Sequence, residues 1–370
     1  MQWDIFCRVV DNLGDIGVCW RLCADLANRG ERVRLWIDAP DDLHWMAPGA
    51  LQGQVPGVEV IHWTEPMTRS VDWLAANVWI EAFGCDPAQE CLDALAAHLR
   101  SGGRAPVWLN LEYMSAERYV ERCHRLPSPI MTGPLQGLTK WFFYPGFTSA
   151  TGGLLREDDL EKRQALHSPS KWLEELGLPL GSGRRVSLFC YSPEALPQLL
   201  REAGNDPAAD ADWLVTQGWA SDAVDAAVHT QGTPGPSCRL HALPRLTQRD
   251  YDHLLWSCDL NFVRGEDSLV RAIWAGKPFV WHIYPQHDNA HHAKLEAFLD
   301  WLKAPDSMRL FYRAWNGMVS ADPLWPRWDV IAQWDECVRS ARSNLRSDQS
   351  LGSQLLEFVL GQHATDALCP

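Results

Sequence analysis

The stretch from Leu246 to Gln286 constrains the fold most, because it reads as a helix, a strand, a second helix and a second strand in succession. A capping box beginning at Thr247 predicts the first helix start, and the short apolar run from Leu260 to Val263 predicts a buried strand. The second helix is expected to open near Ser268 and the next strand to follow at Phe279 to Ile283. This order is typical of a parallel α/β sheet.

The turn after the predicted strand carries polar residues suited to a ligand. In an open parallel sheet such a turn faces the ligand crevice, and the first amides of the following helix favour an anion such as phosphate. Arg264 adds a planar cation for that anion. Glu266 and Asp267 are poorly placed for phosphate and suit a sugar or a cation instead. In the alternative interpretation, Asp267 only complements the helix dipole.

A second polar turn follows the first predicted strand, Trp3 to Val10. The segment from Asp11 to Gly17 predicts a glycine-bearing turn before a helix from Val18 to Ala27. It resembles a dinucleotide-binding fingerprint in position, but the third glycine is missing and two aspartates would repel a pyrophosphate. We therefore expect this turn to hold a sugar or a cationic acceptor. The alternative makes Asp11 a turn former and Asp15 a helix cap.

The remaining patterns predict two α/β domains. We expect a first domain at 1–160, a linker at 161–183, a second domain at 184–345 and a helical C-terminal tail at 346–370. Near the end of one predicted strand, the segment Asn110 to Tyr113 occupies a ligand-facing position, although Glu112 is equally suited to anchor a loop. The other predicted strands of the first domain are Val33–Asp38, Val58–Trp63, Val78–Ala82 and Pro106–Leu111.

Composition narrows the classes of partner. The formal net charge of −14 argues against an extended nucleic-acid surface, which needs clustered Lys and Arg. No signal peptide or membrane-spanning run is evident, so a cytoplasmic protein without a membrane partner is expected. The 11 scattered cysteines suggest neither a disulfide framework nor a zinc site. His287, His291 and His292 are interpreted as solvated helix residues, and no metal site is predicted.

A phosphate-type turn in one α/β domain and an acidic turn in another correspond to a GT-B glycosyltransferase, in which two Rossmann-like domains face a cleft. The segments Asp11 to Arg21 and Asn261 to Ser268 closely resemble the EarP family, bacterial arginine rhamnosyltransferases that modify translation elongation factor P. The similarity extends over essentially the whole chain, including Trp108 to Tyr113 and Gly276 to Phe279. These motifs are long and peculiar to that family.

The resemblance implies an inverting, metal-independent enzyme without a cofactor. It would move L-rhamnose from TDP-β-L-rhamnose to a guanidine nitrogen of one arginine of translation elongation factor P. By position, Asp15 corresponds to the general base, Asp11 supports it, and Glu266 is the second essential carboxylate. The residues that the resemblance assigns to the donor are Asn12, Leu13, Gly14, Phe189, Tyr191, Gln248, Tyr251, Arg264, Gly265, Asp267 and Ser268.

Two other functions fit the same sequence features. One is a nucleotide-sugar enzyme of the same fold that acts on a small acceptor. The other is a non-catalytic protein that binds a translation factor, which would release no TDP. Product analysis with and without elongation factor P distinguishes these alternatives from the arginine rhamnosyltransferase.

Overall fold

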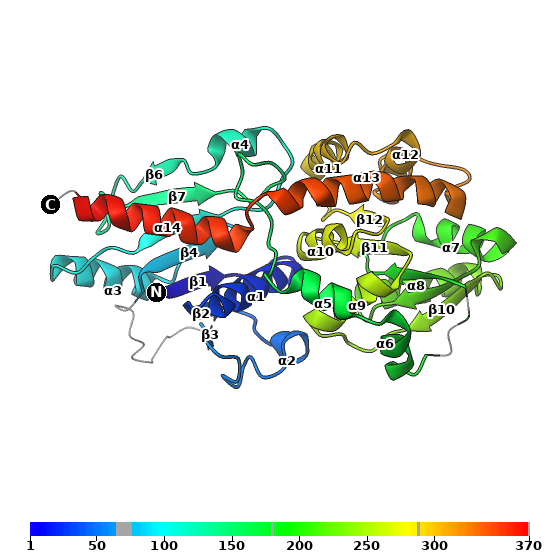
Figure 1. Cartoon of the computed structure of the whole chain (residues 1–370), viewed down its shortest axis with the longest axis horizontal. Coiled ribbons are helices and arrows are strands. Elements are labelled where there is room, and N and C mark those ends of the chain that lie inside the picture. The colour runs from blue at the N-terminus through cyan, green and yellow to red at the C-terminus, as the bar shows by residue number, and fades with distance from the viewer. Residues whose placement is uncertain (64–75, 179–180, 182, 287–288, 369–370) are drawn as a thin grey trace. The chain divides into compact units, whose positions relative to one another are not determined.

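The structure, a computed structural model, describes residues 1–63, 76–178, 181, 183–286 and 289–368. The chain divides into two compact units (Figure 1), Met1–Glu157 with Asp348–Pro370 and Asp158–Ser347. Each unit is built on a mainly parallel sheet with helices against it.

The first unit contains a seven-stranded sheet in the order β3-β2-β1-β4-β5-β7-β6. All neighbouring strands are parallel except the edge pair β6 and β7. The strands are β1 (Gln2–Cys7), β2 (Arg32–Ile37), β3 (Val58–His62), β4 (Val78–Ala82), β5 (Val107–Leu111), β6 (Pro127–Pro129) and β7 (Thr139–Phe143); the helices are α1 (Asn12–Asn28), α2 (Leu43–Met46), α3 (Gln89–Arg100), α4 (Tyr119–Cys123) and α14 (Leu351–Leu368).

Both faces of this sheet are covered, as a buried parallel sheet requires. Trp3 and Ile5 of β1 pack into a core with helices α1 and α14. Phe6 points to the opposite face and packs with Trp36, Trp79 and residues of α3. The alternation follows from the two-residue period of a strand, so one apolar run supplies two cores.

The C-terminal helix α14 belongs to the first unit, although the chain passes through the whole second unit before reaching it. Leu351, Leu355 and Val359 are buried in the same core as β1. Arg29, the C-cap residue of α1, donates hydrogen bonds to the hydroxyls of Ser350 and Ser353. The segment 346–370, which the sequence suggested as a separate tail, thus joins the first unit from Asp348 onward.

The second unit contains a five-stranded, wholly parallel sheet in the order β10-β9-β8-β11-β12. Its strands are β8 (Arg184–Leu188), β9 (Ala211–Val215), β10 (Cys238–Ala242), β11 (Leu260–Arg264) and β12 (Phe279–His282); its helices are α5 (Leu160–Leu166), α6 (Pro169–Glu175), α7 (Leu196–Asn205), α8 (Trp219–Gln231), α9 (Gln248–Ser257), α10 (Asp267–Ala275), α11 (Ala290–Trp301), α12 (Asp306–Trp315) and α13 (Trp328–Ser347).

The segment 161–183, which the sequence suggested as a linker, lies in the second unit. Trp172 and Leu173 of α6 are buried against Leu254 and Cys258 of the α9 region. The described part of this segment therefore contributes to a core, because its apolar residues recur on one helix face.

The helix after β1 begins earlier than its sequence indicates. We predicted a turn over Asp11–Gly17 and a helix from Val18, but α1 starts at Asn12 and includes Gly14 and Gly17. Glycine disfavours a helix by only about 1 kcal/mol, which packing overrides. A Cβ at Gly14 would meet the Asp11 carboxylate, so a larger residue there would have to displace that side chain.

Strands β6 and β7 were not among the strands predicted from the sequence. β7 pairs with β5 and extends the sheet. Its run of aromatic residues alternates too little in polarity to be recognised as a half-buried strand.

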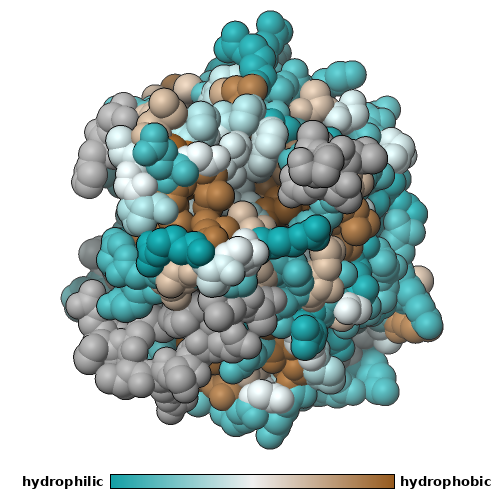
Figure 2. All heavy atoms as spheres, turned by 90° about the vertical axis from the view of Figure 1, so that its left-hand side faces the viewer, coloured by the Kyte–Doolittle hydropathy of each residue, from teal (hydrophilic) through white to brown (hydrophobic). Residues whose placement is uncertain are grey.

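Figure 2 shows hydrophilic side chains over most of one face of the molecule, with hydrophobic residues in the hollows between them. This distribution is ordinary for a chain whose large apolar side chains lie mainly in its cores. None of the helices in the described ranges has the length and apolar character needed to cross a bilayer.

The burial of α14 predicts that its core residues stabilise the first unit. Leu355→Ala should lower the free energy of unfolding of that unit by about 2 to 5 kcal/mol, because it leaves a cavity at a fully buried position. Leu360→Ala is the matched control, since Leu360 is 58% exposed. Differential scanning calorimetry of both variants provides the measurement, and equal effects would contradict this packing.

Candidate functional site

Each sheet has one place where the order of connections reverses. In the first unit β1 lies between β2 and β4, and in the second unit β8 lies between β9 and β11. The loops that leave the carboxyl ends of two such central strands run to opposite faces, so a crevice is left between them for ligands. The predicted site residues follow β1 in the first unit. In the second unit they lie at the ends of β8 and β11, except Gln248 and Tyr251, which belong to α9 after β10.

Asp15 is the most constrained residue after β1. It lies in the first turn of α1 and is only 2% exposed. Its Oδ2 accepts hydrogen bonds from the backbone N–H groups of Val10 and Asp11, both at 2.8 Å. Its Oδ1 accepts a hydrogen bond from the Tyr113 hydroxyl at 3.2 Å. Oδ2 of this carboxylate therefore stabilises the loop between β1 and α1, and Oδ1 faces Tyr113 beyond the end of β5.

Burial raises the pKa of the Asp15 carboxyl above its usual value, and the nearby negative charge of Asp38 raises it further. The hydrogen bonds from Val10, Asp11 and Tyr113 act in the opposite direction and lower the pKa, but burial is the largest effect. The balance gives a carboxylate with a higher proton affinity than an exposed aspartate.

The other residues predicted in this loop have distinct positions. Asp11 occupies the N-cap position of α1 without a side-chain capping bond, and its side chain lies over Gly14. Leu13 packs partly against the core. Asn12 starts the helix, and its side chain lies outside the described structure. Asp15 is not itself the N-cap of α1, but its carboxylate accepts the N–H of the N-cap residue Asp11, so the alternative of a helix-capping role agrees with the structure in part.

Glu112 follows β5 and supports the alternative of a loop anchor. The Asn110 side-chain amide donates to Glu112 Oε1 at 2.9 Å. Burial, followed by the negative charge of Glu112, raises the pKa of the Tyr144 hydroxyl to about 12. Glu112 thus accepts a hydrogen bond from a residue of β5 and lies near Tyr144, the residue that follows β7.

In the second unit, the Arg264 guanidinium lies in an aromatic cage. Its central carbon is 4.5 Å from the Phe189 ring centroid, 4.7 Å from that of Tyr191 and 5.7 Å from that of Trp219. The residue is 5% exposed, and Nη1 donates to the Cys190 carbonyl at 3.4 Å. The three rings surround the guanidinium and hold it in place, so a fixed positive charge is available to an anion at this edge of the sheet.

The turn after Arg264 is closed by Ser268. The Ser268 hydroxyl accepts from the Arg264 N–H at 2.9 Å and donates to the Arg264 carbonyl. Gly265 has a positive φ of 63°, which glycine adopts without strain, and the Trp281 indole donates to its carbonyl at 2.7 Å. These bonds direct the amino end of α10 toward the carboxyl edge of the sheet.

The two acidic residues of this turn differ. Glu266 occupies the N-cap of α10 without a side-chain cap and forms an ion pair with Lys294 of α11 at 2.5 Å. Asp267 is the first residue of the helix and partly buried. Its place in the first turn also agrees with the alternative that it complements the helix dipole.

The predicted nucleotide residues gather beside this cage. Tyr251 contacts the Phe189 ring edge-on, with centroids 5.3 Å apart. Gln248 lies in the same first turn of α9 and is 8% exposed. Phe189 thus lies between the Arg264 cation and the Tyr251 ring, a surface suited to a flat heterocycle.

Four neighbours of these sites were not identified from the sequence. Lys294 and Tyr113 pair with predicted carboxylates, Phe83 stacks on Tyr113, and Trp219 completes the arginine cage. Trp219 carried the only clear signal, since it follows Gly218 shortly after a strand and opens a helix. Tyr113 belongs to the segment predicted to face a ligand at a strand end, but no local pattern links it to Asp15.

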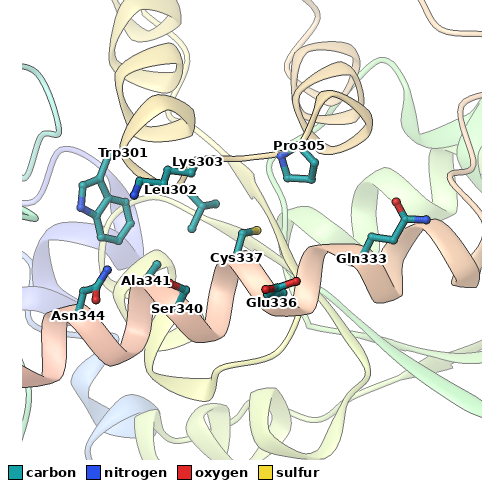
Figure 3. Close-up of a pocket in the computed structure, with 10 residues that line it drawn as sticks. All are labelled: Trp301, Leu302, Lys303, Pro305, Gln333, Glu336, Cys337, Ser340, Ala341 and Asn344. Atoms are coloured by element: carbon teal, nitrogen blue, oxygen red, sulfur yellow. The ribbon is translucent and has the colours of Figure 1, made fainter.

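A cavity of about 300 Å³ lies elsewhere in the second unit, between the end of α11 and α13 (Figure 3). Trp301, Lys303, Glu336 and Cys337 are among its lining residues. It contains none of the predicted site residues, so it is separate from the arginine cage.

Within the described residues, no three His, Cys, Asp or Glu side chains are grouped as metal ligands. His291 is buried, and its Nδ1 accepts the Gln286 N–H at 3.0 Å, so the prediction of a solvated residue was wrong for His291. His287, which the sequence grouped with it, lies outside the described residues.

Comparison with known proteins points to one family. The profile described as Elongation-Factor P (EF-P) rhamnosyltransferase EarP matches residues 3–360. A protein-arginine rhamnosyltransferase of Pseudomonas aeruginosa is 41% identical, with 96% of this chain and 98% of the relative covered. A protein-arginine rhamnosyltransferase of Shewanella oneidensis is also 41% identical, with 80% of each chain covered.

Solved structures agree with this comparison. A structure described as the basis for EarP-mediated arginine glycosylation of translation elongation factor EF-P superposes with a TM-score of 0.64. It is 27% identical and covers 97% of this chain and 99% of its own. The glycotransferase of kitacinnamycin, at 14% identity and a TM-score of 0.50, shares the fold. The predicted GT-B fold is confirmed.

The cage predicts an acid sensitivity that resides in one histidine. Burial, aided by the Arg264 charge, lowers the pKa of His282 to about 3, and its Nδ1 accepts the Tyr191 N–H. An unfolded histidine binds a proton below about pH 6.5, whereas the folded one does not. Stability is therefore lost as pH falls from about 6.5 toward 3, by about 2 to 3 kcal/mol at about pH 4.5.

His282→Asn keeps an acceptor for Tyr191 and should be less acid-sensitive than the unmodified protein, even if it is less stable near pH 7. Urea unfolding at about pH 7 and 4.5 measures the difference. His229→Gln, at an exposed position of α8, is the control and should leave the pH dependence unchanged. If His282→Asn lost as much stability between about pH 7 and 4.5 as the unmodified protein, His282 would not be the source of the acid sensitivity.

Proposed function

The chain belongs to the EarP family of rhamnosyltransferases, and from this premise we propose that it transfers L-rhamnose from TDP-β-L-rhamnose to an arginine of translation elongation factor P. The family match over residues 3–360 supports the reaction. The proposed chemistry depends on the geometry of the buried Asp15. Its Oδ2 is bonded to the loop, and its Oδ1 lies at the strand ends beside Tyr113.

Asp15 acts as the general base in this proposal. An arginine side chain is protonated at neutral pH and is a poor nucleophile until a carboxylate orients it and removes a proton. The guanidine nitrogen forms a bond to the anomeric carbon of rhamnose while the bond from that carbon to the TDP oxygen breaks. The proton passes to Asp15, whose raised pKa favours its uptake, and the bonding electrons leave with TDP. Asp11 supports Asp15 from the N-cap of α1.

The leaving TDP gathers negative charge, which the second unit is equipped to stabilise. Arg264 supplies a fixed cation, and the first amides of α10, with Gly265, Asp267 and Ser268, grip the diphosphate and the sugar. Phe189, Tyr191, Gln248 and Tyr251 hold the nucleotide. Glu266 acts as the second carboxylate and is paired with Lys294. No metal or cofactor is required by this scheme, because the amides and Arg264 supply the positive charge.

Elongation factor P is the proposed protein partner, because the similar solved structure is described by EarP-mediated arginine glycosylation of that factor. The proposed setting is the cytoplasm. The test is the intact mass of elongation factor P after incubation with this protein and TDP-rhamnose. A gain of one rhamnosyl group, absent when the acceptor arginine is replaced by lysine, supports the proposal. TDP release without the factor would favour a small acceptor, and binding of the factor without TDP release would favour a non-catalytic role.

Asp15→Asn should reduce turnover by roughly 10²- to 10⁴-fold, the contribution of a general base, with donor affinity within several-fold. The amide oxygen of the variant can still accept the Val10 and Asp11 N–H groups, and its NH₂ can donate to Tyr113. The loop should therefore keep its shape while the base is lost. Turnover like that of the unmodified enzyme would remove Asp15 from this role.

Arg264→Ala should weaken binding of TDP and of TDP-rhamnose alike, by roughly 1.5 to 3 kcal/mol, the range for a hydrogen bond to a charged group. Isothermal titration measures both affinities. Arg264→Lys should recover part of the loss, because the charge remains while the planar fork of guanidinium N–H groups does not. Unchanged TDP affinity in Arg264→Ala would exclude this arginine from the phosphate site.

A further inference from the structure

Tyr113 connects the ends of two central strands of the first unit to the Asp15 carboxylate. It stands two residues beyond β5, and its hydroxyl donates to Asp15 Oδ1 at 3.2 Å. Its ring stacks on Phe83, with centroids 4.4 Å apart and an interplanar angle of 12°. Tyr113 is 37% exposed, so an aromatic side chain with a polar tip is held at the surface beside a buried acid.

The stack is built on an unusual backbone. Phe83 has a φ of 58°, a left-handed conformation that a bulky residue rarely adopts, and it directly follows β4. Its N–H donates to the Leu111 carbonyl at 2.7 Å, which ties the end of β4 to the end of β5. Strained residues of this kind persist where the surrounding structure requires them, and they are concentrated at functional sites.

The two oxygens of Asp15 are not equivalent. Oδ2 is occupied by the backbone N–H groups of Val10 and Asp11 and is turned into the loop. Oδ1 faces Tyr113, so it is the oxygen at which a substrate proton can be taken. A side chain that contacts Oδ1 controls both the rotation of the carboxylate and its affinity for that proton.

We propose that Tyr113 is a positioning residue for the general base, and that its hydroxyl, held in place by the Phe83 stack, orients Asp15 Oδ1 toward the acceptor. This inference rests on the proposed function and assigns a role to a residue outside the predicted catalytic and donor sets. The Tyr113 hydroxyl stabilises the ionised carboxylate before the acceptor arrives. It therefore sets the pH above which the base is available.

Several groups face Asp15 from the elements around it. Asp38 follows β2 and raises the pKa of Asp15, Asp11 precedes it in the loop, and Cys19 lies on α1. Tyr113 is the side chain that lowers the pKa of Asp15 through a hydrogen bond. Tyr113→Phe removes this hydrogen bond and keeps the ring, so it should raise the pKa of Asp15 by roughly half to one pH unit.

The loss of this hydrogen bond should change the pH dependence of turnover. A general base works only when ionised, so turnover is lost as pH falls through the pKa of Asp15. In Tyr113→Phe the acidic limb of kcat/KM for elongation factor P, measured at saturating TDP-rhamnose, should move to higher pH by that amount. Donor affinity should stay within about twofold. Tyr119→Phe, a change at an exposed tyrosine of the neighbouring helix α4, should leave the limb in place.

A second readout does not depend on catalysis. In protein labelled with ¹³C at aspartate carboxyl carbons, the Asp15 signal is the one lost in Asp15→Asn, and its titration gives the pKa directly. A higher pKa in Tyr113→Phe supports the positioning role, even if no rhamnosylation is found and the proposed function fails. Rhamnosylation by the unmodified enzyme, with neither the signal nor the acidic limb moved in Tyr113→Phe, would overturn the inference.

Discussion

The reversal of strand order at the middle of each sheet is the constraint on which both candidate sites depend. Because β1 and β4, and likewise β8 and β11, send their following segments to opposite faces, the carboxyl ends between them remain uncovered by their own connections. Polar side chains can be placed there without being buried under a crossover helix. Asp15 and Phe83 follow β1 and β4, and Phe189 and Arg264 mark the ends of β8 and β11.

The two units use this shared geometry for opposite charges. In the first unit the loop after β1 wraps around a buried carboxylate, with backbone N–H groups replacing the water that the charge has lost. In the second unit a buried guanidinium is held by aromatic faces, and the amino end of α10 adds positive potential. An acidic site suits a cationic acceptor, and a basic site suits a diphosphate.

Holding the site residues in fixed positions reduces stability at residues next to them. His282 accepts the Tyr191 N–H behind the cage, and the buried setting with the Arg264 charge keeps it neutral. Phe83 holds a left-handed backbone to support Tyr113. Such features reduce stability, but they fix side chains in the geometry that a transition state needs, so no reorganisation is required during the reaction.

The sequence by itself determined the βα units and the nature of their turns. Thr247 is the N-cap of α9, with its hydroxyl accepting the Asp250 N–H at 3.1 Å, and the segment from Arg264 to Ser268 joins the end of β11 to the start of α10. These features depend on neighbours within a few residues, so local patterns identify them. Long motifs also identified the family. The predicted start of α1 was wrong because the same local rules disfavour Gly14 in a helix, a small cost that the packing of α1 in the first core overrides.

Only the tertiary structure decided which residues meet. Tyr113 reaches Asp15 across 98 positions of sequence, Lys294 reaches Glu266 across 28, and the Arg264 guanidinium reaches the Cys190 carbonyl across 74. The return of α14 to the first core is a contact of the same kind. Such pairs depend on strand order, which is set by the free energy of burying whole faces of a sheet. No short stretch of sequence determines this free energy, because it depends on all the strands and helices that cover the sheet. The partner of each charged side chain therefore becomes known only from the assembled sheets.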